Sequence, residues 1–339
     1  MLDGELLDKL DQIARTIRKV PNKPFGGIQL VLTGDFFQLP PIGKTVKFAF
    51  ESKSWPTLIS HSIQLSQIFR QSDPTFINLL NELRMGRMSP ANERILLQLA
   101  RTPAYPQDGI EATQLYSRRD QVERANQSHL DALPGPIIKY TATDWGHSES
   151  HLTRIKKDCN APEVLEVKIG AQVMLIKNLS EVLVNGSVGI ITEFTDVKEG
   201  GGRSYPVVSF ENGMKLPIVP TDWSLEVPGL GLMASRNQVP LLLAWAMYVG
   251  QKLALIDSTL TNKFPIHSLP HSSIHKSQGQ TLTRVKVDLG SIFECGQAYV
   301  ALSRATSLQG LQVLNFRPSI IKVNPKVVSF AKLLEALPF

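Results

Sequence analysis

Three stretches of this 339-residue chain gather side chains that bind phosphate. They are T-G-D-F-F-Q-L-P-P at 33–41, I-H-K-S-Q-G-Q-T-L at 274–282 and Q-A-Y-V-A-L-S-R-A at 297–305. Amide, ammonium and guanidinium groups all donate hydrogen bonds to phosphate oxygens. Side chains of these types can hold phosphate, but residue types alone assign no role to the three stretches.

A glycine-rich phosphate loop does not accompany them. Gly43-Lys44-Thr45 looks like the end of the pattern G-x-x-x-x-G-K-[ST], but the position that needs the first glycine holds Gln38. Pro40 and Pro41 lie between the two and carry no backbone N–H. Because such a loop binds phosphate through converging N–H groups, this match is rejected.

Composition sets the outer limits of the protein class. A chain of this length holds two or three domains, and 42% hydrophobic and 19% charged residues are typical of a globular protein. The net charge of +6 weakly favours a polyanionic partner. Cys159 and Cys295 are the only cysteines, which excludes a disulfide framework and a cysteine-based zinc site. No apolar run reaches membrane-spanning length, so we expect no membrane partner.

Periodicity and capping residues predict an α/β fold that is interrupted by a β-rich insertion. The expected elements are a helix at 3–19, a buried strand at 28–33, helices at 74–85 and 90–100, a strand at 112–116 and a helix at 119–132. Short alternating stretches and turns such as Asn212-Gly213 predict a small antiparallel β barrel between about 163 and 226. The α/β alternation returns with a strand at 285–289, a helix at 295–305 and a strand at 311–315.

Together these stretches resemble the Pif family (petite integration frequency) of ATP-dependent DNA helicases, superfamily-1 motors that move 5′ to 3′. The resemblance also rests on F-R-Q-S-D at 69–73 and on G-A-Q-V-M-L-I-K-N-L and L-V-N-G-S-V-G within 170–189. It implies two RecA-like motor domains with ATP between them. The implied division is 1–60 for the end of motor domain one, 61–160 plus 273–339 for motor domain two, and 161–247 for the inserted barrel.

The resemblance also implies roles for single residues. Gln38 matches the glutamine that senses the γ-phosphate, and Arg70 and Arg304 match two arginine fingers, which stabilise charge on the transferred phosphoryl group. Gly279 and Gln280 fall in the same nucleotide site. An alternative for Arg70 is a salt bridge to Asp73.

The stretch around residue 275 matches the motif that borders the DNA track. His275, Lys276, Ser277 and Gln278 would hold phosphates of single-stranded DNA without reading its sequence. The rival interpretation is a metal site built from His267, His271 and His275, which Pro270 disfavours because it breaks the required helix. Phe36 and Phe37 are expected in a core, with one ring a candidate for stacking on a base.

Two departures from the family pattern stand out. The family segment D-E-[IV]-S-M-[LV]-D corresponds here to a sequence that starts at Met1, so the P-loop lysine and the Asp-Glu magnesium ligands would lie upstream. We therefore expect a chain truncated within motor domain one and inactive by itself. Residues 248–272 are the second departure. Codons for 247–249 and 271–272 can encode intron borders, which makes a retained intron the leading hypothesis and a genuine loop the alternative.

The sequence-based expectation is thus an ATP- and Mg²⁺-dependent 5′-to-3′ DNA helicase acting on single-stranded, forked or structured DNA. The family implies roles in DNA repair, recombination and telomere maintenance, in the nucleus, the mitochondrion or both. A RecD-like or relaxase-linked helicase and a non-catalytic nucleic-acid-binding fragment remain the alternatives.

Overall fold

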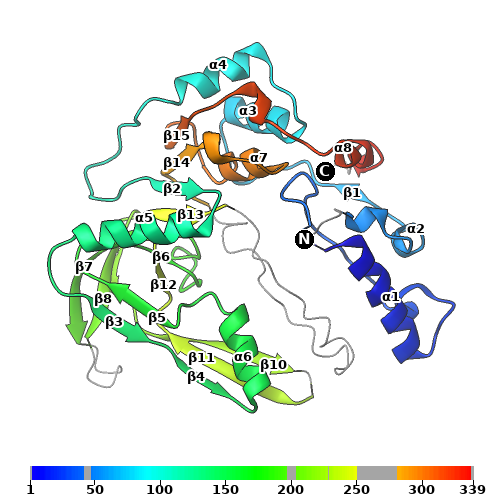
Figure 1. Cartoon of the computed structure of the whole chain (residues 1–339), viewed down its shortest axis with the longest axis horizontal. Helices are drawn as coiled ribbons and strands as arrows, with labels where there is room; N and C mark the ends of the chain where they lie inside the picture. Colours follow the sequence, from blue (N-terminus) through cyan, green and yellow to red (C-terminus); the bar gives the residue numbers. More distant parts are fainter. Residues whose placement is uncertain (1, 42–46, 197–203, 228, 250–280, 337–339) are drawn as a thin grey trace.

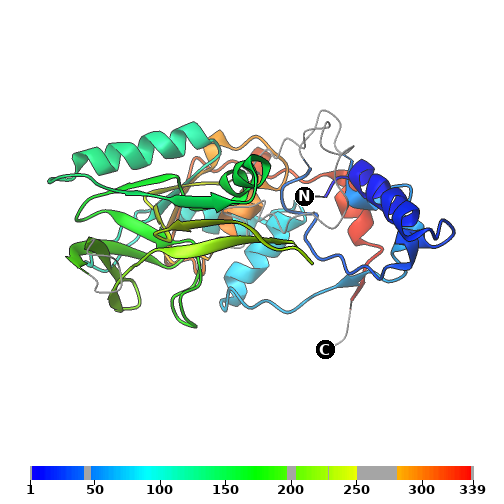
Figure 2. The same ribbon diagram turned by 90° about the horizontal axis from the view of Figure 1, so that it is seen from below.

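The computed structural model describes residues 2–41, 47–196, 204–227, 229–249 and 281–336. Helices α1, α2 and α8 lie at one end of an elongated molecule, and the sheets lie towards the other end, with the parallel sheet above the antiparallel strands in the view of Figure 1 (Figures 1 and 2). The helices are α1 Gly4–Arg18, α2 Trp55–Leu58, α3 Pro74–Arg84, α4 Pro90–Gln98, α5 Arg119–Ala132, α6 Glu149–Asp158, α7 Gln297–Leu302 and α8 Pro325–Ala331.

The predicted helices at the N-terminal side are confirmed by their caps. Asp3 caps α1 by accepting from the N–H groups of Glu5 and Leu6. Asp73 and Ser89 cap α3 and α4 in the same way, each followed by a proline at the first helical position. Beyond α3, Gly86 adopts the left-handed φ of +69° that ends the helix.

The buried strand predicted at 28–33 is wrong. This segment is extended but belongs to no strand, and the side chain of Val31 is 85% exposed. A strand is stable only when its N–H and C=O groups pair with a neighbour, and no described strand pairs with this segment. An apolar pattern can indicate a strand, but the pattern alone cannot supply a pairing partner.

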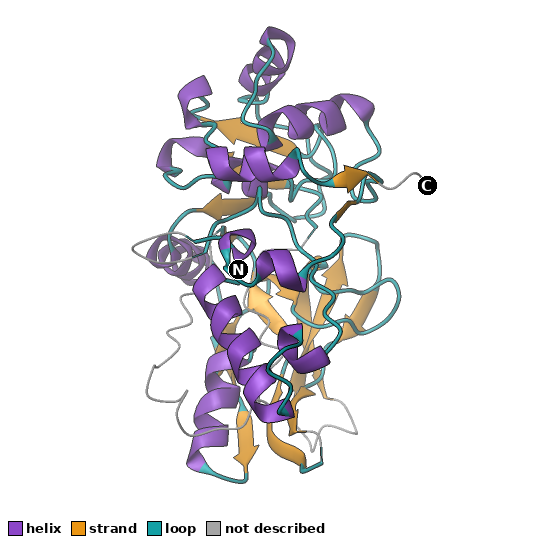
Figure 3. Ribbon diagram, turned by 90° about the vertical axis from the view of Figure 1, so that its right-hand side faces the viewer, coloured by secondary structure: helices purple, strands orange, loops and turns teal. Residues whose placement is uncertain are grey.

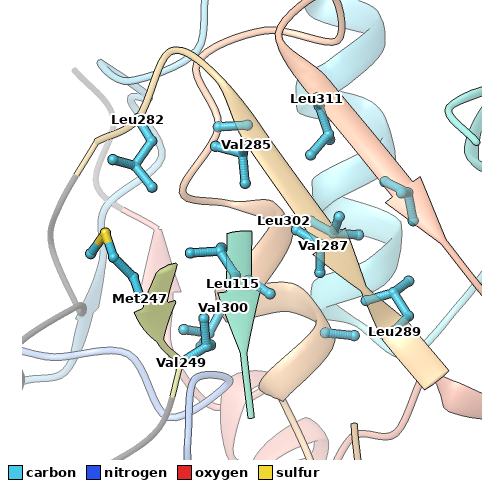
Figure 4. Close-up of a cluster of buried hydrophobic side chains, with 14 of the residues drawn as sticks. Leu115, Met247, Val249, Leu282, Val285, Val287, Leu289, Val300, Leu302 and Leu311 are labelled. Carbon is cyan, nitrogen blue, oxygen red and sulfur yellow. The ribbon is translucent and has the colours of Figure 1, made fainter. Parts of the chain in front are cut away.

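A four-stranded parallel sheet forms the centre of the molecule. Its strands lie in the order β13-β2-β14-β15, and all three pairings are parallel. The bounds are β2 Thr113–Tyr116, β13 Ala246–Tyr248, β14 Val285–Asp288 and β15 Leu311–Leu314. Figure 4 shows Leu115, Val285 and Val287 of this sheet meeting Val300 and Leu302 of α7. Helix α3 adds Phe76, Leu79 and Leu83 to the same core and contacts α7.

Antiparallel sheets make up the β-rich part; in Figure 3 the long strands lie in the lower half of the picture, behind helices. A five-stranded sheet has the order β12-β6-β7-β8-β9, a three-stranded sheet the order β10-β11-β4, and β3 pairs with β5. Their bounds are β3 Ile138–Thr141, β4 Thr143–Gly146, β5 Val164–Val167, β6 Gln172–Leu175, β7 Val188–Asp196, β8 Ser204–Phe210, β9 Lys215–Pro217, β10 Thr221–Val227, β11 Gly231–Gln238 and β12 Leu241–Leu243. Among the described strands no ladder joins β12 to β9, so closure into a barrel stays a prediction.

The predicted Asn212-Gly213 hairpin is confirmed. It connects β8 to β9, and Gly213 has the positive φ of +81° that a tight hairpin turn requires. Residues between β7 and β8 lie outside the described residues, and so does the Gly43-Lys44-Thr45 stretch.

An aromatic cluster joins α8 to the segment that precedes α2. The rings of Phe50 and Phe330 stack with centroids 4.3 Å apart, and Phe36 meets both of them edge-on. Phe37 is 5% exposed. Both phenylalanines of the F-F-Q-L-P-P stretch are therefore core residues, which confirms that expectation. A short two-stranded parallel pairing, β1 Ile63–Gln64 with β16 Glu335–Ala336, lies near this end.

The end of the proposed barrel at residue 247 and the start of the proposed insertion at residue 248 both fall within β13. The domain division itself stays a prediction. Strand β13 belongs to the parallel sheet, and Val249, just after it, donates its N–H to the Tyr116 carbonyl at 2.7 Å. Tyr248 and Val249 are thus part of the described fold, while the rest of the 248–272 stretch lies outside it. In the described part of the chain, no helix is long and apolar enough to cross a membrane.

Candidate functional site

The loop that carries Gln38 lies against the start of α7. Gly296, which precedes that helix, has a φ of +74°. A Cβ placed there would lie 2.4 Å from the Phe37 carbonyl oxygen and 2.8 Å from that of Gln38. Only glycine permits this close approach. The contact brings the first predicted phosphate-binding stretch against the third, 258 residues later.

Arg70 lies near the end of α7 and contacts Thr281 and Ser303. Its Nε donates to Thr281 Oγ1 at 3.0 Å, and its guanidinium also donates to the Ser303 carbonyl at 3.0 Å. Gln71 is buried and donates to the carbonyls of Ser303 and Ala305. Asp73, the alternative partner of Arg70, caps α3 through the Thr75 N–H at 2.8 Å. The described contacts of Arg70 therefore favour its placement at the end of α7.

Arg304 lies beside Arg70 and is one of the most buried side chains, with 2% exposure. Its Nε donates to the Val300 carbonyl at 2.9 Å and its Nη2 to Ser303 Oγ at 3.2 Å. Burial and, to a smaller extent, the neighbouring charge of Arg70 together lower the pKa of Arg304 to about 10. Two adjacent guanidinium groups, one of them desolvated, form a site that a multiply charged anion would stabilise.

Gln38 is half-buried and turned back on its own loop. Its Nε2 donates to Asp35 Oδ2 at 3.4 Å, and its backbone N–H donates to the Asp35 carbonyl at 3.2 Å. Asp35 Oδ1 accepts the Phe37 N–H at 3.1 Å. The loop 35–38 is therefore a compact turn organised by the Asp35 carboxylate.

The pKa of Tyr299 on α7 responds to the charges of the Gln38 loop and of both predicted fingers. This residue was not singled out from the sequence. Burial raises the pKa of its phenol, and the charge of Asp35 raises it further, while Arg84, Arg304 and Arg70 act in the opposite direction. One side chain of α7 thus lies in the electric field of the Gln38 loop and of both predicted fingers. The signal was present in the sequence, because Tyr299 is the third residue of Q-A-Y-V-A-L-S-R-A.

The four predicted DNA-binding residues, His275, Lys276, Ser277 and Gln278, lie outside the described residues, as do Gly279 and Gln280. The three histidines of the rival metal interpretation lie there too. Thr281, the next residue, is described and accepts the hydrogen bond from Arg70. One predicted finger is therefore tied directly to the end of the predicted DNA-coupling stretch.

Known proteins share both sequence and fold with this chain. The sequence model of a family described as "PIF1-like helicase" matches residues 1–94, and one described as "DNA helicase Pif1, 2B domain" matches residues 150–194. The crystal structure of Pif1 helicase from Candida albicans is 40% identical, with a TM-score of 0.73 over 99% of this chain and 75% of that one. The chain belongs to the PIF1-like helicase family.

Other members of this family extend the comparison. The human ATP-dependent DNA helicase PIF1 is 41% identical over 337 residues, which cover 97% of this chain and 47% of that protein. The chain thus spans about half the length of this curated relative. A Pif1 helicase from Bacteroides, solved in complex with ADP-AlF3 and single-stranded DNA, is 25% identical with a TM-score of 0.60 over 98% of this chain and 73% of that one.

Proposed function

We propose that the protein of which this sequence forms a part is an ATP-dependent DNA helicase that moves 5′ to 3′ on single-stranded DNA. The observation that carries the proposal is the meeting of Arg70 and Arg304 at the end of α7, beside Thr281 of the DNA-coupling stretch. Such a contact can transmit the presence of nucleotide to the DNA track. The family resemblance supports the same reading.

The residues divide the work as follows. Arg70 and Arg304 would hold γ-phosphate oxygens of ATP and stabilise the negative charge that develops there during hydrolysis. The amide of Gln38 can donate to a phosphate oxygen and accept from the attacking water. The buried, electropositive surroundings of Arg304 fit a phosphate group, since an anion would offset the cost of its desolvated charge.

Mg²⁺ would neutralise the phosphates and orient them when bound. The resemblance assigns its Asp-Glu ligands, and the P-loop lysine, to sequence that the printed 339 residues do not contain. For this reason we expect the printed chain to lack ATPase activity. Gly279 and Gln280 are proposed to complete the nucleotide site.

The proposed partners are single-stranded and forked DNA, held by His275, Lys276, Ser277 and Gln278 through the phosphate backbone. The Bacteroides relative with bound single-stranded DNA supports the DNA partner. Roles in repair, recombination and telomere maintenance, and a nuclear or mitochondrial location, are proposed from the family resemblance alone.

ATP turnover in the presence and absence of single-stranded DNA tests the proposal. The comparison uses the printed chain and an extended protein, defined as this chain with a P-loop and the magnesium-binding Asp-Glu pair supplied upstream of residue 1. We expect DNA-stimulated turnover by the extended protein only. Turnover by the printed chain that disappears in Arg304→Ala would refute the expected inactivity. An extended protein that binds DNA without hydrolysing ATP would instead favour a nucleic-acid-binding fragment.

A further inference from the structure

Arg84, the last residue of α3, lies against the Gln38 loop, and no motif of the sequence drew attention to it. Its Nη2 donates to Asp35 Oδ1 at 2.9 Å. Its guanidinium carbon lies 4.3 Å from the centre of the Phe37 ring. The side chains of Arg84 and Asp35 are only 25% and 17% exposed. One arginine therefore contacts the loop at two positions, by an ion pair and by stacking.

The carboxylate that Arg84 binds is also the group that organises the loop. Asp35 accepts the Phe37 N–H and the Gln38 side-chain amide, at 3.1 and 3.4 Å. Loss of the Arg84 charge would thus weaken more than one contact. It would leave a partly buried carboxylate without the ion pair beside the amide that the proposed mechanism requires.

The charge of Asp35 also matters for ligand binding. A carboxylate at the edge of a phosphate site repels the incoming triphosphate unless a cation offsets it. Asp35 raises and Arg84 lowers the pKa of Tyr299 on α7, so the two charges oppose each other at this helix. Arg84 is thus placed to offset the field of Asp35 at the site.

Helix α3 links this pair to the first finger. It begins at Pro74, four residues after Arg70, and it ends at Arg84. Phe76, Leu79 and Leu83 anchor it in the core. A rigid helix therefore holds a finger arginine near its start and the Gln38 loop at its end.

We infer that Arg84 is a positioning residue for Gln38: it holds the 35–38 loop against α3 and offsets the charge of Asp35, without itself contacting the nucleotide. The role assigned to Gln38 rests on the proposed function. The contact between Arg84 and the loop does not.

Amide hydrogen exchange of the printed chain tests the contact itself. Arg84→Gln should speed exchange of the Phe37 and Gln38 amides about tenfold or more, the effect expected when a charge-assisted hydrogen bond is lost. Arg84→Lys, which keeps the charge but loses the planar stack, should fall between this variant and the parent. Arg87→Gln removes an exposed charge just beyond the same helix and should change nothing. Unchanged exchange in Arg84→Gln would overturn the inference.

ATP kinetics of the extended protein separate positioning from direct contact. Arg84→Gln should raise KM for ATP about tenfold, and adding Asp35→Asn should recover most of that loss, because the repelling charge is then gone. A finger arginine that touches phosphate would show no such recovery, and that outcome would also overturn the inference. If the extended protein hydrolyses no ATP, the proposed function fails, and hydrogen exchange alone decides the role of Arg84.

Discussion

Arg304 is a buried cation whose charge lowers the stability of the folded protein. Its folded-state pKa of about 10 lies below the ordinary value of 12.5, so the folded protein disfavours the charged form. The charge of Arg304 therefore lowers stability by its full amount below about pH 10, and this cost is lost progressively as the pH rises from about 10 towards the ordinary value of 12.5. A buried cation kept at such a cost is typical of a site that awaits an anion.

The first prediction concerns the two fingers. In the extended protein, Arg70→Ala and Arg304→Ala should each lower ATP turnover by about 10³-fold or more, because each removes a charge from the developing phosphoryl transition state. The affinity for single-stranded DNA without nucleotide should change little. Arg94→Ala, an exposed arginine on α4, is the matched control. Near-normal turnover in either finger variant would show that its assignment is wrong.

The sequence motifs predicted roles for Gln38, Arg70 and Arg304, but not the contacts that surround them. In the structure Arg70 and Arg304 lie close together at the end of α7. The contact between Asp35 and Arg84 was not predicted, because it spans 49 residues and follows no spacing rule. Long-range ion pairs depend on tertiary packing, which a local pattern does not encode.

The Gln38 loop contacts the start of α7 at Gly296, and this contact predicts how substitution of Gly296 changes stability. Gly296→Ala forces a Cβ to within 2.4 Å of the Phe37 carbonyl oxygen at a positive φ. Gly213→Ala shares the positive φ but meets no atom within 4 Å. We expect about 1 kcal/mol of destabilisation for Gly213→Ala from φ alone and about 1–3 kcal/mol more for Gly296→Ala from the clash. Urea unfolding measures both, and equal values would contradict the close approach.

The Asp144–Arg236 pair fastens β4 to β11 and predicts a pH dependence. Arg236 is 2% exposed and binds both Asp144 oxygens at 2.7 Å. Its hydrogen bonds hold the pKa of Asp144 below the ordinary 3.8, so the pair contributes stability above that value and loses it as the pH falls further. Asp144→Asn should cost about 3–5 kcal/mol at pH 7, because it leaves a buried charge unpaired.

Unfolding measured from pH 7 down to pH 2 checks this. The difference between Asp144→Asn and the parent should shrink as the pH falls from 3.8 through the lowered pKa of the folded-state carboxylate, because the parent carboxylate is then neutral too. Asp158→Asn, which removes a more exposed i,i+4 partner of Arg154 on α6, should cost less than about 1 kcal/mol. A constant difference across the pH range would show that the charge of Asp144 is not the cause.

Elements with both caps and periodicity were predicted well, and those that depend on a partner were not. Asp73-Pro74 and Ser89-Pro90 located α3 and α4, because capping is decided within one turn. The segment 28–33 has the composition of a buried strand, yet Ile28 and Val31 are exposed and no described strand lies beside it. Pairing is a property of the whole sheet and not of one segment.

At the scale of the whole molecule, the 248–272 stretch begins at the last residue of β13, the strand Ala246–Tyr248 of the parallel sheet. Met247 and Val249 point into the core, with 7% and 3% exposure. The spliced form implied by the intron hypothesis reads Ala246-Ile-Ser-Ile274. It would place isoleucines at both buried positions and serine at the half-buried one, so the alternation of β13 is kept.

The shortened protein should therefore melt at the same temperature as the printed chain or higher. A long insertion in a loop carries only a small closure entropy, so tolerance of the stretch would not by itself distinguish a retained intron from a genuine loop. Transcript sequencing across codons 247–273, together with thermal melts of both forms, decides the question. Transcripts that always keep the stretch, with a shortened form that melts lower, would establish it as genuine structure.

The central proposal is that the protein is a motor that moves 5′ to 3′ on single-stranded DNA. Strand separation by the extended protein on forked DNA with either a 5′ or a 3′ single-stranded tail tests it most directly. The account predicts ATP-dependent unwinding of the 5′-tailed fork only, lost in Arg304→Ala. Unwinding of the 3′-tailed fork, or unwinding that survives Arg304→Ala, would contradict it.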